Sequence, residues 1–70
     1  MDEIKLLDVV ALTEDLPNES LHRGEVGTIV EMLAPEVYEV EFCDREGRTY
    51  AMLPLKPNQL MKLRYRDAAA

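Results

Sequence analysis

The sequence predicts an all-β domain built from five short strands. Short runs rich in Val, Ile, Tyr, Phe and Leu alternate with turn residues, and no stretch of ten or more residues carries a helical period. The 70 residues suffice for one domain, and 47% hydrophobic with 31% charged residues is a globular composition. A domain this small buries only about 60% of the surface of its unfolded chain, so we expect no deep substrate pocket and no enzyme.

Five hydrophobic runs are the expected strands. The third has the clearest pattern, because Tyr38, Val40 and Phe42 alternate with Glu39 and Glu41, as in a strand with one buried and one wet face. The five expected strands span residues 6–12, 24–33, 37–43, 48–53 and 61–65.

Turn residues separate these runs. A long polar loop is expected over residues 13–20. Residues 44–47 predict a four-residue hairpin turn in which Gly47 adopts a positive φ. Two prolines near the end of the chain leave room for a single turn of 3₁₀ helix, at residues 57–59, before the last strand.

A glycine inside the second run predicts an irregular strand. Val26, Ile29 and Val30 cannot all face one side of a regular strand. We therefore expect Gly27 to form a bulge with a positive φ, or to mark a place where another backbone approaches closely.

The expected core takes the apolar face of each run. In the fourth run we assign Tyr50 and Met52 to that face, and at the end of the chain Leu60 and Leu63. The full set is Val9, Leu12, Val26, Ile29, Val30, Tyr38, Val40, Phe42, Tyr50, Met52, Leu55, Leu60 and Leu63.

The order of these elements is strand, long loop, strand, short loop, strand, tight hairpin, strand, helical turn, strand. That order resembles an SH3-like barrel, in which five strands curl around one core and hide their edges. An OB-fold is the alternative, but no segment fits the helix that it usually carries. We expect residues 1–66 to form this domain and residues 67–70 to be a disordered tail.

Two stretches carry family resemblances. Residues 22–30, HRGEVGTIV, resemble the strand entry of KOW-type and other SH3-like barrels. Over residues 6–63, the segments LDVVAL, RGEVGTIVE, YEVEF and GRTYA resemble a family of small bacterial proteins classed as a domain of unknown function. The resemblance implies an SH3-like barrel in the bacterial cytoplasm, and it brings no catalytic residues.

Reactive side chains are scarce. The chain has one His, His22, and one Cys, Cys43, so a four-ligand zinc site and an internal disulfide are both excluded, and we expect no metal and no cofactor. Glu39 and Glu41 lie on the wet face of their strand, where both stay ionised, which argues against acid–base catalysis. The lone cysteine, the acidic start and the lack of a long apolar run predict a cytoplasmic protein with no contact to membranes.

The charge distribution predicts a protein partner. The chain has fourteen acidic and eight basic residues, which gives a net charge of −6. Residues 1–46 contain thirteen of the acidic residues but only three of the basic ones. An acidic surface of this kind suits a basic protein, as in small antitoxin-like or immunity-like accessories. The residues that we expect to meet the partner are Asp15, Glu19, Glu31, Glu39 and Glu41.

The basic end of the chain supports two alternatives. Lys62, Arg64 and Arg66 alternate in the sequence and would form a basic stripe on one face of the last strand, which is the pattern of a KOW-like RNA- or DNA-binding module. The net negative charge opposes approach to phosphate, so nucleic acid is the second choice. The last strand could also pair with its own copy at an exposed edge, giving a homodimer.

Overall fold

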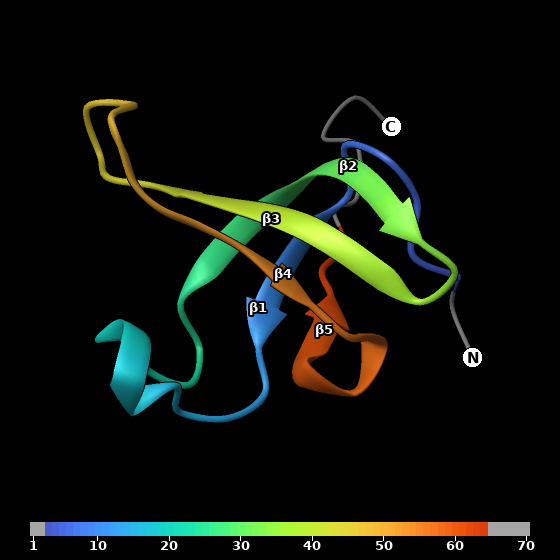
Figure 1. The fold of residues 1–70 in the computed structure, drawn as a ribbon. Helices are drawn as coiled ribbons and strands as arrows, with labels where there is room; N and C mark the ends of the chain where they lie inside the picture. The colour runs from blue at the N-terminus through green and yellow to red at the C-terminus, as the bar shows by residue number, and fades with distance from the viewer. Residues whose placement is uncertain (1–2, 65–70) are drawn as a thin grey trace.

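The computed structural model describes residues 3–64, which form one antiparallel sheet (Figure 1). Its strands are β1 (Val9–Leu12), β2 (Val26–Ala34), β3 (Val37–Cys43), β4 (Thr49–Leu55) and β5 (Leu60–Lys62), with two 3₁₀ turns, η1 (Pro17–Glu19) and η2 (Pro57–Gln59). The all-β prediction and the predicted turn before the last strand are confirmed. The other turn, η1, lies inside the expected long loop and was not predicted.

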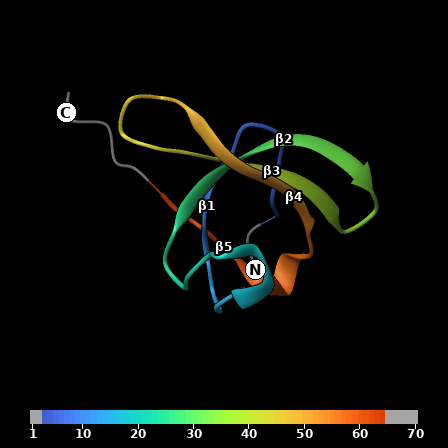
Figure 2. The ribbon, with the colours of Figure 1, turned by 60° about the vertical axis from the view of Figure 1, so that its left-hand side comes forward.

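The strands lie in the order β4-β3-β2-β1-β5, and the sheet curls strongly on itself (Figure 2). The edge strands β4 and β5 do not pair with each other within residues 3–64, so the sheet is not closed. Both edges carry features that discourage pairing with another chain: β5 is three residues long, and β4 contains Pro54.

The chain before β1 forms a turn, although a strand was expected from residue 6. The N–H of Asp8 donates to the carbonyl oxygen of Lys5 at 3.0 Å, and Leu7 adopts a φ of +71°. A positive φ interrupts the extended backbone, so β1 begins only at Val9. At the other end of the sheet, β5 stops at Lys62, and residue 65 of the expected strand lies outside the described residues.

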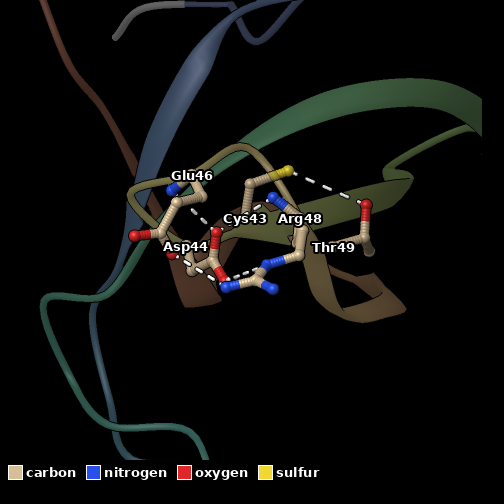
Figure 3. A network of polar contacts seen from close by, with 5 residues as sticks. All are labelled: Cys43, Asp44, Glu46, Arg48 and Thr49. Carbon is tan, nitrogen blue, oxygen red and sulfur yellow. Dashed lines mark hydrogen bonds and ion pairs between the residues drawn. The ribbon is translucent and has the colours of Figure 1, made fainter.

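The β3–β4 hairpin turns over residues 44–47, as predicted. Gly47 has a φ of +83°, and the Asp44 N–H donates to the Arg48 carbonyl oxygen at 2.8 Å. The Asp44 carboxylate also accepts the N–H groups of Glu46 and Arg48, at 2.9 Å each, and the Arg48 guanidinium pairs with both acids (Figure 3). A short polar side chain at the first turn position therefore satisfies two backbone N–H groups of the turn.

The core lies inside the curl of the sheet and centres on Phe42, which is fully buried. Seven expected core residues are buried, and so are four that were not expected, Ile4, Val10, Ala11 and Leu21. The seven are Leu12, Ile29, Tyr38, Val40, Phe42, Leu55 and Leu60.

The predicted inward face of β4 is wrong. Tyr50 and Met52 are half exposed, whereas Ala51 and Leu53 pack against the core together with Leu55. The pairing explains this, because Ala51 lies opposite Phe42 and cross-strand partners share a face of the sheet. A register shift beside Cys43 leaves Tyr50 unpaired, and such a bulge resets the alternation that the sequence suggests.

Four more core assignments need correction. Val26 is exposed, and Val9, Val30 and Leu63 are only half buried. In β1, Val10 and Leu12 point to the core, so Val9 takes the other face. Val30 lies between the paired residues Ile29 and Glu31, at a register shift of β2, which explains its partial burial.

Gly27 permits a close approach and does not form the bulge. Its φ is not positive, and a Cβ atom built there would lie 2.7 Å from Val40 Cγ1 and 2.9 Å from the Glu41 carbonyl oxygen. Of the two alternatives for Gly27, the structure thus supports the close approach of β3, and the bulge lies three residues further on.

Candidate functional site

The clearest chemical feature of the sheet is a row of carboxylates on its outer face. Glu31 on β2 lies directly opposite Glu39 on β3, and Glu41 follows on the same face, between Thr28 and Met52 of the neighbouring strands. We call Glu31, Glu39 and Glu41 the acidic face. The expected alternation of β3 is confirmed, since Tyr38, Val40 and Phe42 are buried while the glutamates between them reach solvent.

The ion pairs found among the described residues lie outside the acidic face. Among residues 3–64, the ion pairs formed by Arg48, Lys62 and His22 involve other acids, Asp44, Glu46, Asp8 and Glu25. Glu41 accepts a hydrogen bond from the Thr49 hydroxyl. Like charges directly opposite each other destabilise a sheet, so the pair of Glu31 and Glu39 reduces the stability of the chain.

The other two expected partner residues lie elsewhere. Asp15 and Glu19 belong to the long loop around η1, which Figure 1 shows at the opposite end of the sheet from the β2–β3 turn. The Asp15 carboxylate accepts the N–H of Arg23 at 2.8 Å and thereby fixes the loop, and Glu19 is exposed. The structure therefore brings three of the five expected residues together.

A hydrogen-bonded cluster around Glu25 joins the long loop to β4. One carboxylate oxygen of Glu25 accepts the Tyr50 hydroxyl at 2.7 Å, and the other accepts the His22 N–H at 2.7 Å and lies 3.3 Å from His22 Nδ1. The bond from Tyr50, followed by that from His22, lowers the pKa of Glu25. The same bond raises the pKa of Tyr50 to about 12, because ionised tyrosine could no longer donate to the carboxylate.

Little in the sequence indicates this cluster. Glu25 and Tyr50 are 25 residues apart, and the face on which Tyr50 lies depends on the bulge in β4. The short spacing of His22 and Glu25 is a local signal, but it does not indicate the tyrosine. Its hydrogen bonds connect His22, at the end of the loop, with Tyr50 of β4, so we assign the cluster a structural role in holding the loop.

The expected basic stripe does not form an open surface at Lys62. The Lys62 side chain lies on the same side of β5 as Leu60, where it is 25% exposed and pairs with Asp8 at 3.2 Å. The N–H of Lys5, together with Lys62, holds the pKa of Asp8 below its usual value. Arg64 is exposed at the end of the described chain, and Arg66 lies outside the described residues.

The reactive side chains of the described residues have separate partners. No group of three His, Cys, Asp or Glu side chains within residues 3–64 is arranged to hold a metal ion. Cys43 is an exposed thiol, 3.8 Å from the Thr49 hydroxyl (Figure 3). His22 lies in a loop with Glu25 as its partner. Two hollows border η2 and share Glu36 and Pro57 in their linings. One is also lined by Pro35, Val37, Lys56 and Asn58, and the other by Glu3, Ile4, Tyr38, Leu60, Met61 and Lys62.

The described residues also lack any helix of the length and hydrophobicity needed to cross a membrane.

Comparison with known proteins returns one family. A model described as Domain of unknown function (DUF4926) matches residues 6–62 of the 70-residue chain. Neither a curated protein nor a solved structure matches the chain. The matched stretch contains all five strands and the three glutamates of the acidic face.

Proposed function

The chain belongs to the family described as Domain of unknown function (DUF4926), and we propose a function for it that is based on the residues of the acidic face. The protein is a non-catalytic interaction module of the bacterial cytoplasm that binds a basic partner protein through its acidic face.

The observation that carries this proposal is the opposition of Glu31 and Glu39. A sheet gains stability when residues of opposite charge face each other across two strands. Here two carboxylates of the same charge face each other on an exposed face. A partner that brings Lys or Arg to this face would relieve the repulsion, so the arrangement that weakens the isolated chain favours the complex.

The strand arrangement supports an SH3-like barrel as the scaffold. The order β4-β3-β2-β1-β5 places a long loop between β1 and β2, a tight hairpin between β3 and β4 and a 3₁₀ turn before β5. In this scaffold the outer faces of β2 and β3 are free for a partner, while the inner faces form the core.

The alternative of nucleic-acid binding has less support. Its first residue, Lys62, is engaged with Asp8 and points to the inner side of β5. Phosphate binding depends on accessible cations, and the net charge of −6 slows the approach of any polyanion.

The test is affinity capture from lysates of the source organism, with and without nuclease treatment, followed by titration of the purified captured protein. We expect the triple variant Glu31→Gln, Glu39→Gln, Glu41→Gln to lose binding at least about tenfold, or about 1.4 kcal/mol. The control Glu14→Gln, Glu36→Gln, Glu46→Gln has the same net charge and should bind as the wild type does. Equal binding by both triple variants, or capture of nucleic acid alone, would refute the proposal.

A further inference from the structure

Two adjacent leucines form the tip of an exposed turn. The turn over residues 5–8 is closed by the bond from the Asp8 N–H to the Lys5 carbonyl oxygen, and the Asp8 carboxylate accepts the Lys5 N–H at 2.7 Å. Leu6 is 54% exposed and Leu7 is 70% exposed. The turn thus presents large apolar side chains at a place where small polar residues are usual.

Leu7 is also in an unfavourable backbone conformation. Its φ of +71° at the third turn position is one that glycine or asparagine adopts easily and a bulky residue adopts rarely. Its side chain gains little from the core, because most of it is in solvent. Neither the backbone nor the packing of residues 3–64 therefore accounts for a leucine here, and exposed apolar side chains of this kind are typical of a contact with another molecule.

The turn lies beside β2, the strand that carries Glu31. The Leu7 N–H donates to the Ile29 carbonyl oxygen at 2.7 Å, and the Ile29 N–H donates to the Asp8 carbonyl oxygen at 2.9 Å. Ile29 is followed in β2 by the shifted residue Val30 and then by Glu31, which faces Glu39. The apolar tip thus lies beside β2, two residues along the strand from Glu31.

We infer that Leu6 and Leu7 are the apolar anchor of the interaction, and that they insert into a hydrophobic pocket of the partner protein that is bordered by Lys or Arg. This inference rests on the proposed function and adds the residues that enter the partner. Charge complementarity indicates what kind of partner contacts the leucines. Lys or Arg at the border of the pocket would pair with Glu31 and Glu39, whereas an anionic lipid surface would be repelled by them. Apolar anchors in pockets commonly dominate the binding energy of protein interfaces.

The decisive variants are Leu7→Gly and Leu7→Asn. Both residues accept a positive φ, so we expect the thermal unfolding midpoint to stay the same or to rise. Both remove the anchor, so we expect binding to the purified captured protein to weaken at least tenfold. The matched control is Met61→Gln, which replaces a methionine that is 55% exposed on β5 and should leave binding unchanged.

The outcomes separate this inference from the proposed function. Loss of binding by both Leu7 variants, with a retained melting midpoint, supports it, provided that the wild-type complex also weakens as salt is raised. If the Leu7 variants bind normally while the acidic-face variant does not, the function stands and the anchor is wrong. A clear drop in the midpoint would make Leu7 a packing residue and also overturn the inference. Binding of the wild type to phosphatidylcholine vesicles, lost in both variants, would assign the leucines to a lipid surface instead.

Discussion

At the scale of single residues, Glu25 connects parts of the chain that the sheet alone would leave apart. Its carboxylate receives the Tyr50 hydroxyl from β4 and the His22 N–H from the end of the long loop. Tyr50 in turn packs against Phe42, with ring centroids 6.3 Å apart. One partly exposed side chain therefore ties the loop and the hairpin to the centre of the core.

Removing the Tyr50 hydroxyl should show what this link contributes. We expect Tyr50→Phe to lower the free energy of unfolding by about 1 kcal/mol at neutral pH, because it deletes a hydrogen bond to a carboxylate while keeping the ring on Phe42. Urea unfolding at pH 7 measures this difference. A Tyr50→Phe variant as stable as the wild type would show that water replaces the bond without loss.

The same bond gives a pH dependence with a defined sign. Folding raises the pKa of Tyr50 from 10.0 to about 12, so its stabilising contribution is complete below pH 10 and is lost as the pH rises through about 12. The wild type should thus lose more stability over this interval than Tyr50→Phe does. Chemical unfolding at a series of pH values between these limits checks the prediction, and parallel losses in both proteins would contradict it.

Gly27 offers a test of close packing. Replacing it by Ala would place a methyl group 2.7 Å from Val40 Cγ1 and 2.9 Å from the Glu41 carbonyl oxygen. Because backbone and a fully buried valine cannot easily move, we expect a loss of about 1–3 kcal/mol in the free energy of unfolding. Thermal melts would detect this, and an unchanged melt would mean that β2 and β3 separate more readily than the structure indicates.

At the scale of elements, β4 shows why part of the fold escapes prediction from sequence. The period of β3 is clear because Tyr38, Val40 and Phe42 alternate with acids, and the structure follows it. β4 has apolar residues on both faces, so its orientation depends on the pairing with β3 and on the bulge at Tyr50. The register of β4 against β3 determines which of its side chains face the core, and this register cannot be read from the local sequence.

The candidate site was predictable to a similar degree. Alternation alone places Glu39 and Glu41 on one face, but the opposition of Glu31 and Glu39 requires the register of β2, which includes a shift at Val30. The pairing of Lys62 with Asp8 likewise depends on β5 lying beside β1. Contacts between strands distant in sequence are the part of the site that the sequence leaves open.

The orientation of β4 can be tested with a matched pair of variants. Leu53 packs against the core and lies opposite Val40, whereas Met52 lies opposite Glu41 on the outer face. We expect Leu53→Ala to cost about 1–2 kcal/mol, less than full burial would give, and Met52→Ala to change stability by no more than about 0.5 kcal/mol. Denaturant unfolding of the two variants decides the face, since the reverse order of losses would restore Met52 to the core.

At the scale of the whole molecule, the net charge of −6 is concentrated where it opposes folding. Thirteen of the fourteen acidic residues lie in residues 1–46, and two of them, Glu31 and Glu39, face each other across β2 and β3. Repulsion between exposed charges weakens when salt screens it, so the isolated chain should become more stable as salt is added. A bound cationic partner would have the same effect, confined to the acidic face.

Glu39→Gln separates these contributions. It removes one of the two opposed charges while keeping the size of the side chain, so we expect it to stabilise the isolated protein by about 0.2–1 kcal/mol at low salt. At about 1 M salt, where charges are screened beyond about 3 Å, the gain should largely disappear. Thermal melts of the wild type and the variant at both salt concentrations measure the change.

If Glu39→Gln destabilises the protein at low salt, the two carboxylates do not repel across the strands, and relief of that repulsion cannot drive partner binding. If the variant is more stable but binds the partner less well, the acidic face lowers the stability of the free chain and serves the complex.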